Sequence, residues 1–250
     1  MKSTSFIVNT MLTLLISFCM WEIASTVAGP QYFPHTWIVL PDFISLILSF
    51  SFVQNLFVTL SLSLIGFIAG SVCATSIAIA VTLNKSGDLA TRGVIDFFRS
   101  IPSVVFLPLL IASIGSSART AVILATFVVT FKLVTYVIRG IHQTETRLID
   151  SAEIMKLPFI TKIFLLYLPS TVSIAGTGMR LSASRSFGTI VASGIVAGTP
   201  GLGSALLIAE SSGNYPRTFS YVIVMGIVGS LIYAGFTKLE NQLIHWRISV

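Results

Sequence analysis

The chain has 250 residues, of which 54% are hydrophobic and only 10% are charged, and its mean hydropathy is +0.92. A water-soluble domain of this length could not bury so much apolar surface, so the composition excludes a soluble protein and indicates one that folds in a bilayer. The net charge of +6 comes from dispersed basic residues with no aromatic-basic stripe, which argues against a nucleic-acid partner.

Six apolar stretches reach or approach the roughly 20 residues that a membrane-spanning helix needs. They cover residues 6–27, 57–83, 101–114, 121–138, 172–196 and 219–236. The runs are continuous rather than alternating, which favours helices over a membrane β-barrel. We therefore predict an all-α integral membrane protein in which residues 1–250 form one domain with about six transmembrane helices.

The first stretch has a second interpretation. Residues 1–29 resemble a cleaved signal peptide, but the long apolar run and the acidic Glu22 near its far end favour a retained helix. Cys19 and Cys73 lie inside proposed spans without metal-ligand spacing. We expect both to be buried small hydrophobes, and we predict no metal site.

The basic residues are distributed unevenly between the two sides that these spans define. With the N-terminus inside, ten of them lie in cytoplasmic segments and only Arg119 and Arg217 lie outside. The ten are Lys2, Lys85, Arg92, Arg99, Arg139, Arg147, Lys156, Lys162, Lys238 and Arg247. Because cytoplasmic segments carry the excess of Lys and Arg, both termini are predicted to be cytoplasmic.

Small residues recur along the second span. Gly66, Gly70, Ala74 and Ala78 are four residues apart, so they share a face that lets another helix approach closely. We expect this face to serve packing rather than solute contact.

The third span contains Pro102 and Pro108 and is short. Proline removes a backbone donor, so we expect a bent helix that frees some carbonyls, and we expect the span to extend into residues 113–119. In the fourth span, Lys132 places a charge at membrane depth, which is tolerated only where it faces protein or water. Lys132 is therefore expected to face inward as part of a pathway; the alternative is a lysine that snorkels or pairs with a carbonyl.

Residues 139–170 form a cytoplasmic loop far longer than a helix connection requires. Asp150 or Ser151 can cap a short helix there, and Leu157, because it precedes a proline, is pushed out of the helical region. Pro158 can begin a second helix, which is expected to end near Pro169. The predicted loop is thus a helix, a sharp turn and a second helix.

This loop resembles the EAA loop of the membrane subunits of type I ABC importers. That pattern is Glu-Ala-Ala, three residues, glycine, nine residues, isoleucine, one residue and Leu-Pro. Here Asp150-Ser151-Ala152 fills the first three places, Leu166 replaces isoleucine and Leu168-Pro169 is in register. Lys156 stands where glycine is usual, and we expect the Leu157-Pro158 step to supply the turn instead.

Other segments resemble the subfamily that imports nitrate, bicarbonate, taurine, aliphatic sulfonates and thiamine precursors. They are Trp21-Glu22, Leu40-Pro41, Gly66-Phe67 to Gly70, Arg99 to Ser103 with Pro108-Leu109, Gly178 to Leu181, Gly201 to Gly203, and Leu239-Glu240 to Trp246-Arg247. The resemblance covers nearly the whole chain. It implies the type I importer permease fold with a cytoplasmic coupling helix.

The resemblance also implies partners. No phosphate-binding Gly-rich loop occurs in the chain, so it is not expected to be an enzyme, and it carries no predicted catalytic residue or bound cofactor. We expect a homodimer in the bacterial inner membrane, two ATPase subunits that use ATP and Mg, and an extracytoplasmic binding protein that delivers the solute. The residues expected to couple to the ATPase are Asp150, Ser151, Ala152, Glu153, Met155, Lys156, Leu157 and Pro158.

Two departures from the subfamily concern the pathway. Relatives commonly have glutamate where this chain has Gly194, and proline where it has Lys132, so both changes make the pore region more positive. We infer a small anionic solute; a thiamine precursor or other neutral solute, or a secondary carrier, remain as alternatives. The candidate pathway residues are Lys132, Arg180, Ser184 and Arg185, and the candidate gate or bend residues are Pro102, Pro108, Gly201 and Gly203.

Overall fold

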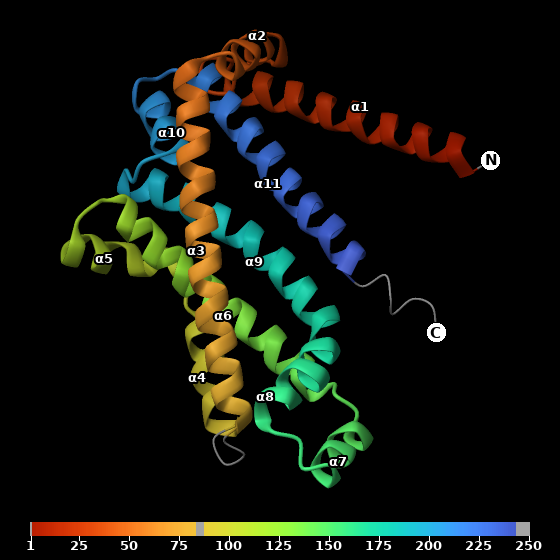
Figure 1. Cartoon of the computed structure of the whole chain (residues 1–250). Coiled ribbons are helices and arrows are strands. Elements are labelled where there is room, and N and C mark those ends of the chain that lie inside the picture. Colours follow the sequence, from red (N-terminus) through yellow and green to blue (C-terminus); the bar gives the residue numbers. More distant parts are fainter. Residues whose placement is uncertain (1, 84–87, 244–250) are drawn as a thin grey trace.

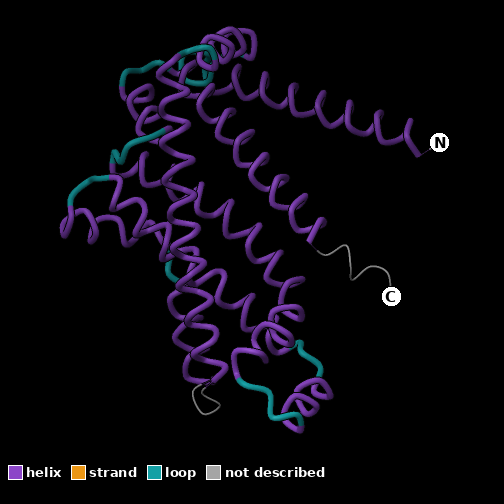
Figure 2. The backbone as a smooth tube through the Cα atoms, viewed as in Figure 1, coloured by secondary structure: helices purple, strands orange, loops and turns teal. Residues whose placement is uncertain are grey.

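The computed structural model describes residues 2–83 and 88–243, and every regular element in these ranges is helical (Figures 1 and 2). Lys85, Trp246 and Arg247 lie outside the described residues. The elements are α1 (Lys2–Ala28), α2 (Thr36–Ile47), α3 (Phe50–Leu83), α4 (Asp88–Ser100), the 3-10 turn η1 (Ser103–Phe106), α5 (Leu107–Ile114), α6 (Ala118–His142), α7 (Thr146–Ile154), α8 (Phe159–Lys162), the π-helical segment η2 (Ile163–Tyr167), α9 (Leu168–Ala197), α10 (Leu202–Ser211) and α11 (Tyr215–Leu243).

Five helical stretches of the described chain are long and apolar enough to cross a bilayer, and a bent pair of shorter helices is a sixth candidate. The five are Val8–Ala28, Phe50–Thr82, Ala118–His142, Ile160–Ser211 and Tyr215–Gln242. The prediction of an all-α membrane protein with about six spans is confirmed.

The third predicted span is a broken one. Residues Gly93–Ser100 and Ser103–Ile114 meet at 84°, and Pro102 lies at the bend. Pro108 lies in the first turn of α5, where no backbone donor is needed. The expected extension into residues 113–119 is wrong, because Gly115 takes a positive φ of 76° and ends α5, and Ser117 then caps α6.

The second span begins at Phe50 instead of residue 57. Gln54 and Asn55 lower the local hydropathy without interrupting the helix, so a hydropathy boundary misplaces its start. The predicted small-residue face packs against α6. A Cβ on Gly66 would lie 2.7 Å from Ala125 Cβ, and one on Gly70 would lie 2.6 Å from Val129 Cβ, so only glycine permits this approach.

Helix α1 diverges from the bundle and is joined to it at its C-terminal end (Figure 1). There the Glu22 carboxylate accepts the Thr36 N–H at 3.0 Å and lies 2.6 Å from His35 Nδ1. The Trp21 indole donates to the Pro34 carbonyl at 3.1 Å. Cys19 on α1 and Cys73 on α3 are both exposed, so the expectation that they are buried is wrong: each points to the outer, apolar surface of its helix.

Candidate functional site

Residues 143–170, which include the predicted coupling residues and are called the coupling loop below, lie at the end of the molecule opposite α2 and α10 (Figure 1). Its first helix, α7, begins at Thr146 with Glu145 before it, so the prediction that Asp150 or Ser151 caps the helix is wrong. The Ser151 hydroxyl instead donates to the Arg147 carbonyl at 2.8 Å, inside the helix. Thr146 and Arg147 extend the helix towards the N-terminus because nothing between Glu145 and Asp150 breaks it.

Lys156 forms the turn after α7. It has a φ of 49°, the only left-handed value among the described non-glycine residues. The Lys156 N–H donates to the Glu153 carbonyl at 3.0 Å and the Leu157 N–H to the Ala152 carbonyl at 3.1 Å, which is the Schellman pattern of helix ends. The turn therefore uses the position where glycine is usual, and the expectation that the Leu157-Pro158 step supplies the turn instead is wrong.

The second helix of the loop starts one residue after Pro158 and does not end near Pro169, contrary to the prediction. It continues from α8 through η2 into α9. Pro169 lies in the first turn of α9, directly after a π-helical segment. Widening of the helix in η2 accommodates the ring and the missing N–H of proline, which a regular α-helix interior would not.

Apolar side chains are exposed around this turn. Ile154 is 84% exposed and Met155 is 65% exposed, and Leu148 and Ile160 are also exposed; we call these four residues the loop patch. Ala152 is 1% exposed, and Leu157 is half-buried. Met155 and Leu157 are both among the residues expected to contact the ATPase. Met155 is exposed enough for a partner to reach, whereas Leu157 is partly covered by its own chain. Asp150, Glu153 and Pro158 are exposed beside the patch.

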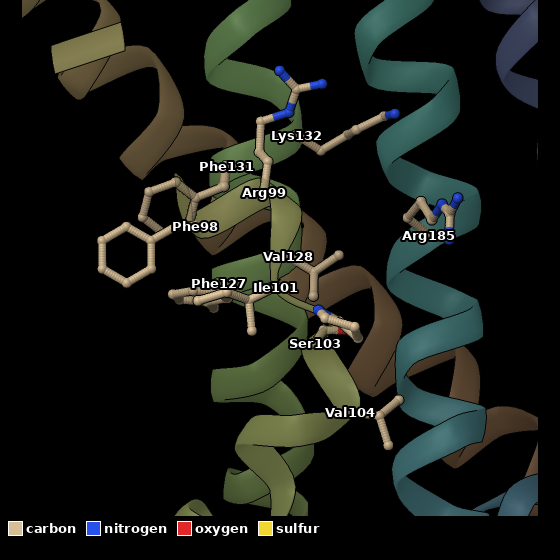
Figure 3. A pocket seen from close by; sticks show the side chains of 11 residues that line it. Phe98, Arg99, Ile101, Ser103, Val104, Phe127, Val128, Phe131, Lys132 and Arg185 are labelled. Atoms are coloured by element: carbon tan, nitrogen blue, oxygen red, sulfur yellow. The ribbon is translucent and has the colours of Figure 1, made fainter. Parts of the chain in front are cut away.

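A pocket of about 410 Å³ lies where the α4–η1 bend meets α6 and α9 (Figure 3). Lys132 from α6 and Arg185 from α9 line it together with Arg99 from the end of α4. The other lining residues are Phe98, Ile101, Pro102, Ser103, Val104, Phe127, Val128 and Phe131. The bend at Pro102, which the sequence predicted, places Arg99 and Ser103 in the same wall.

The pocket is positively charged. None of its lining residues is acidic. Arg99 pairs with Asp96 on its own helix, with 3.1 Å between Nη1 and Oδ1, whereas no carboxylate among the described residues pairs with Lys132 or Arg185. The charge distribution of the sequence predicts only that Arg99 is cytoplasmic; the Arg-Ser-Ile-Pro-Ser run at the predicted bend is the signal that points to its place in this pocket.

Arg180 does not lie in this pocket. Its Nη1 is 3.1 Å from Glu240 Oε2 and 3.4 Å from the Thr237 hydroxyl, and its guanidinium lies 4.9 Å from the centre of the Tyr233 ring. These contacts join α9 to α11. Ser184 donates to the Arg180 carbonyl at 3.3 Å and does not line the pocket either. The structure therefore brings together Lys132 and Arg185 and separates them from Arg180 and Ser184.

Gly201 and Gly203 form the bend between α9 and α10, away from the pocket. Gly201 has a φ of 131°, and the next residue, Leu202, donates its N–H to the Thr59 hydroxyl at 2.8 Å. A Cβ on Gly203 would lie 2.2 Å from the Val191 carbonyl oxygen, and Gly194 meets Gly203 backbone to backbone. Gly194 is thus a packing position, so the absence of an acid there does not change the charge of the pocket.

Comparisons with known proteins are consistent with this architecture. Residues 63–243 match the family described as binding-protein-dependent transport system inner membrane component. A protein of Brucella abortus (strain 2308) named as a probable ABC transporter permease is 24% identical over 224 residues, covering 89% of each chain. The taurine transport system permease protein TauC of Escherichia coli (strain K12) is 21% identical, covering 89% of this chain and 76% of TauC.

A solved structure has the same fold. An inward-facing structure of the MetNI methionine ABC transporter contains a chain that superposes with a TM-score of 0.68 at 16% identity. The match covers 77% of this chain and 95% of the other. The expected resemblance to importer permeases, including the taurine group, is confirmed.

Proposed function

This chain belongs to the family of binding-protein-dependent transport system inner membrane components, and on that premise we propose that it conducts a small anionic solute. Membership makes it a membrane-spanning permease subunit of an ABC importer and not an enzyme. The observation that supports an anionic solute is the pocket lined by Lys132, Arg185 and Arg99 without an acid. Unpaired cations at membrane depth are unfavourable unless water or a negative ligand reaches them.

The same proposal covers the assembly. Two copies of the chain would form the pathway, two ATPase subunits would bind ATP and Mg, and an extracytoplasmic binding protein would deliver the solute. The loop patch supports ATPase docking, because exposed apolar residues on a short, structured helix suit insertion into a partner's groove. Movement of α7 would pass into α9 through the continuous helix α8–η2–α9.

A neutral solute and a secondary carrier are the two competing functions. A neutral solute would leave the charges of Lys132 and Arg185 without a ligand. A secondary carrier would be driven by an ion gradient instead of ATP. Family membership favours the importer, and the unpaired cations favour the anion.

Uptake by proteoliposomes that contain the permease with its ATPase and binding protein tests this function. We expect uptake of an anion such as methanesulfonate or nitrate, and this uptake should require ATP. The variant Lys132→Met should reduce uptake about tenfold or more, since a charge-assisted hydrogen bond contributes about 1.5–3 kcal/mol. Lys238→Met, which removes an exposed lysine of α11, is the matched control and should transport normally.

Two outcomes would contradict the proposal. Uptake that follows a proton or sodium gradient and ignores ATP would identify a secondary carrier. Unchanged uptake by Lys132→Met would remove this lysine from the pathway.

A further inference from the structure

One wall of the cationic pocket is aromatic. Phe127 and Phe131 from α6 have ring centres 4.7 Å apart, and Phe98 from α4 lies 4.9 Å from Phe131. All three rings line the pocket, and Phe106 supports Phe127 from η1 at 4.9 Å. Figure 3 shows the rings on one side of the space and Lys132 and Arg185 on the other. The pocket is therefore divided into an apolar half and a positive half.

The charges suit an anionic head group. Asp96 offsets the charge of Arg99. Lys132 and Arg185, on facing helices, have no carboxylate partner among the described residues, although Lys132 also lies 5.9 Å from the centre of the Tyr136 ring. The Ser103 side chain and the bend at Pro102 lie in the same lining. An oxyanion with several acceptor oxygens, such as a sulfonate or carboxylate, can accept from both cations at once.

The size of the pocket separates two kinds of anion. Sites for small organic molecules are typically about 300–1,000 Å³, and this pocket of about 410 Å³ lies in that range. An inorganic anion such as nitrate has only four heavy atoms and would fill a small part of this volume, since even one water molecule takes a share of about 30 Å³ in the liquid. Nitrate would leave the phenylalanine wall uncovered, whereas an anion with an apolar body would cover it.

Resting on the proposed importer function, we infer that the pocket selects an organic anion with an oxyanion head and an apolar, preferably aromatic, body. The head lies between Lys132 and Arg185, and the body lies against Phe98, Phe127 and Phe131. An aromatic body adds offset or edge-to-face contacts with these rings to the burial of apolar area. The phenylalanine wall favours such an organic anion over nitrate or bicarbonate at this site.

Equilibrium binding to the full-length permease tests this selection without its transport partners. Benzenesulfonate and methanesulfonate share a head group and differ in the body, and each is titrated calorimetrically into permease in phosphatidylcholine nanodiscs. We expect benzenesulfonate to bind about tenfold more tightly, which corresponds to about 1.4 kcal/mol of ring contact.

Variants assign the two halves of the pocket. Lys132→Met should weaken the binding of both sulfonates about tenfold and keep the ratio of their affinities. Phe127→Leu should reduce the affinity for benzenesulfonate, and so the ratio, and leave the affinity for methanesulfonate unchanged. The matched controls are Lys238→Met and Phe57→Leu, which alter exposed residues outside the pocket, and they should bind as the unmodified chain does.

Equal affinity for the two sulfonates would overturn the inference, as would full displacement of benzenesulfonate by phosphatidylglycerol in the nanodisc, which would identify a lipid head-group site. These failures are distinct from failure of the proposed function. If the two sulfonates bind equally but uptake still requires ATP, only the preference for an aromatic body is refuted. If benzenesulfonate binds more tightly but no ATP-driven uptake occurs, only the importer function is refuted.

Discussion

Lys156 occupies a backbone conformation that lysine adopts at a cost. A left-handed residue with a Cβ is about 1–2 kcal/mol less favourable than a right-handed one, and glycine avoids this penalty but loses more chain entropy on folding. The two hydrogen bonds at Lys156 and Leu157 hold the turn in place. The lysine thus preserves the geometry of the loop while making it less stable than glycine would.

Lys156→Gly should stabilise this turn by about 1 kcal/mol, because it removes the strain and keeps the hydrogen bonds. Amide hydrogen exchange at residues 155–157 of the full-length protein should slow by roughly fivefold, the factor that corresponds to this energy. Lys156→Ala removes the same side chain but keeps a Cβ, so it should show no slowing. Equal protection in both variants would indicate that the left-handed conformation is not strained.

Arg180 and Glu240 illustrate how one contact changes the interpretation of a residue. From the sequence, Arg180 was a candidate for the pathway. In the structure its charge is balanced by Glu240 at 3.1 Å and it rests on Tyr233. The pair connects two of the subfamily-like segments, Gly178 to Leu181 and Leu239-Glu240, so these segments are explained by packing between α9 and α11.

At the scale of elements, the second helix of the loop is continuous with the bundle. Helix α7 ends in a defined turn, and α8 continues through η2 into the 30 residues of α9. A helix transmits displacement along its axis, whereas a flexible connection would absorb it. Two irregular steps lie between α7 and the bundle: the left-handed turn at Lys156 and the widened turn before Pro169.

Met155→Asp should weaken association with the ATPase at least about tenfold, because an exposed apolar contact becomes a charge that loses hydration on docking. The measurement is co-purification of the ATPase with solubilised permease.

Gln143→Asp, at an exposed position before α7, is the matched control and should retain the ATPase. A substitution at Ala152 would be less informative, because Ala152 is 1% exposed and a charge there would disturb the loop itself. Normal co-purification of Met155→Asp would contradict docking at the loop patch.

At the scale of the whole molecule, the coupling loop and the α2–α10 region lie at opposite ends (Figure 1). The excess of basic residues on the loop side predicts that this end is cytoplasmic. Helix α1 contacts the rest of the described chain near its C-terminal end, through Glu22 with His35 and Thr36 and through Trp21 against Phe219 of α11. Only 6% of its apolar stretch is buried. Lipid or another subunit can therefore surround it.

Cysteine labelling on intact cells tests this orientation. In a chain without Cys19 and Cys73, Ser211→Cys should react with a membrane-impermeant maleimide, because the end of α10 is predicted to face outward. Gln143→Cys should react only after the membrane is permeabilised. The reverse pattern would invert the topology and place the loop patch on the side without the ATPase.

The sequence by itself determined the membrane environment, the number of spans, the broken third span and the position of the coupling loop. These follow from hydropathy, proline chemistry and motif spacing, which are local properties. It misplaced the start of α7, and it predicted that the second helix of the loop ends near Pro169, where the helix in fact continues into α9. Helix ends depend on caps and on π-helical widening, which composition does not reveal.

Only the tertiary structure decided which charges meet. Lys132 and Arg185 are 53 positions apart in sequence numbering and come together because α6 packs along α9. Arg180, five residues before Arg185 on the same helix, faces α11 and forms an ion pair with Glu240. A sequence shows that a charge lies at membrane depth, but its neighbours are set by the rotation and packing of whole helices, and these neighbours determine whether the charge is available to a ligand.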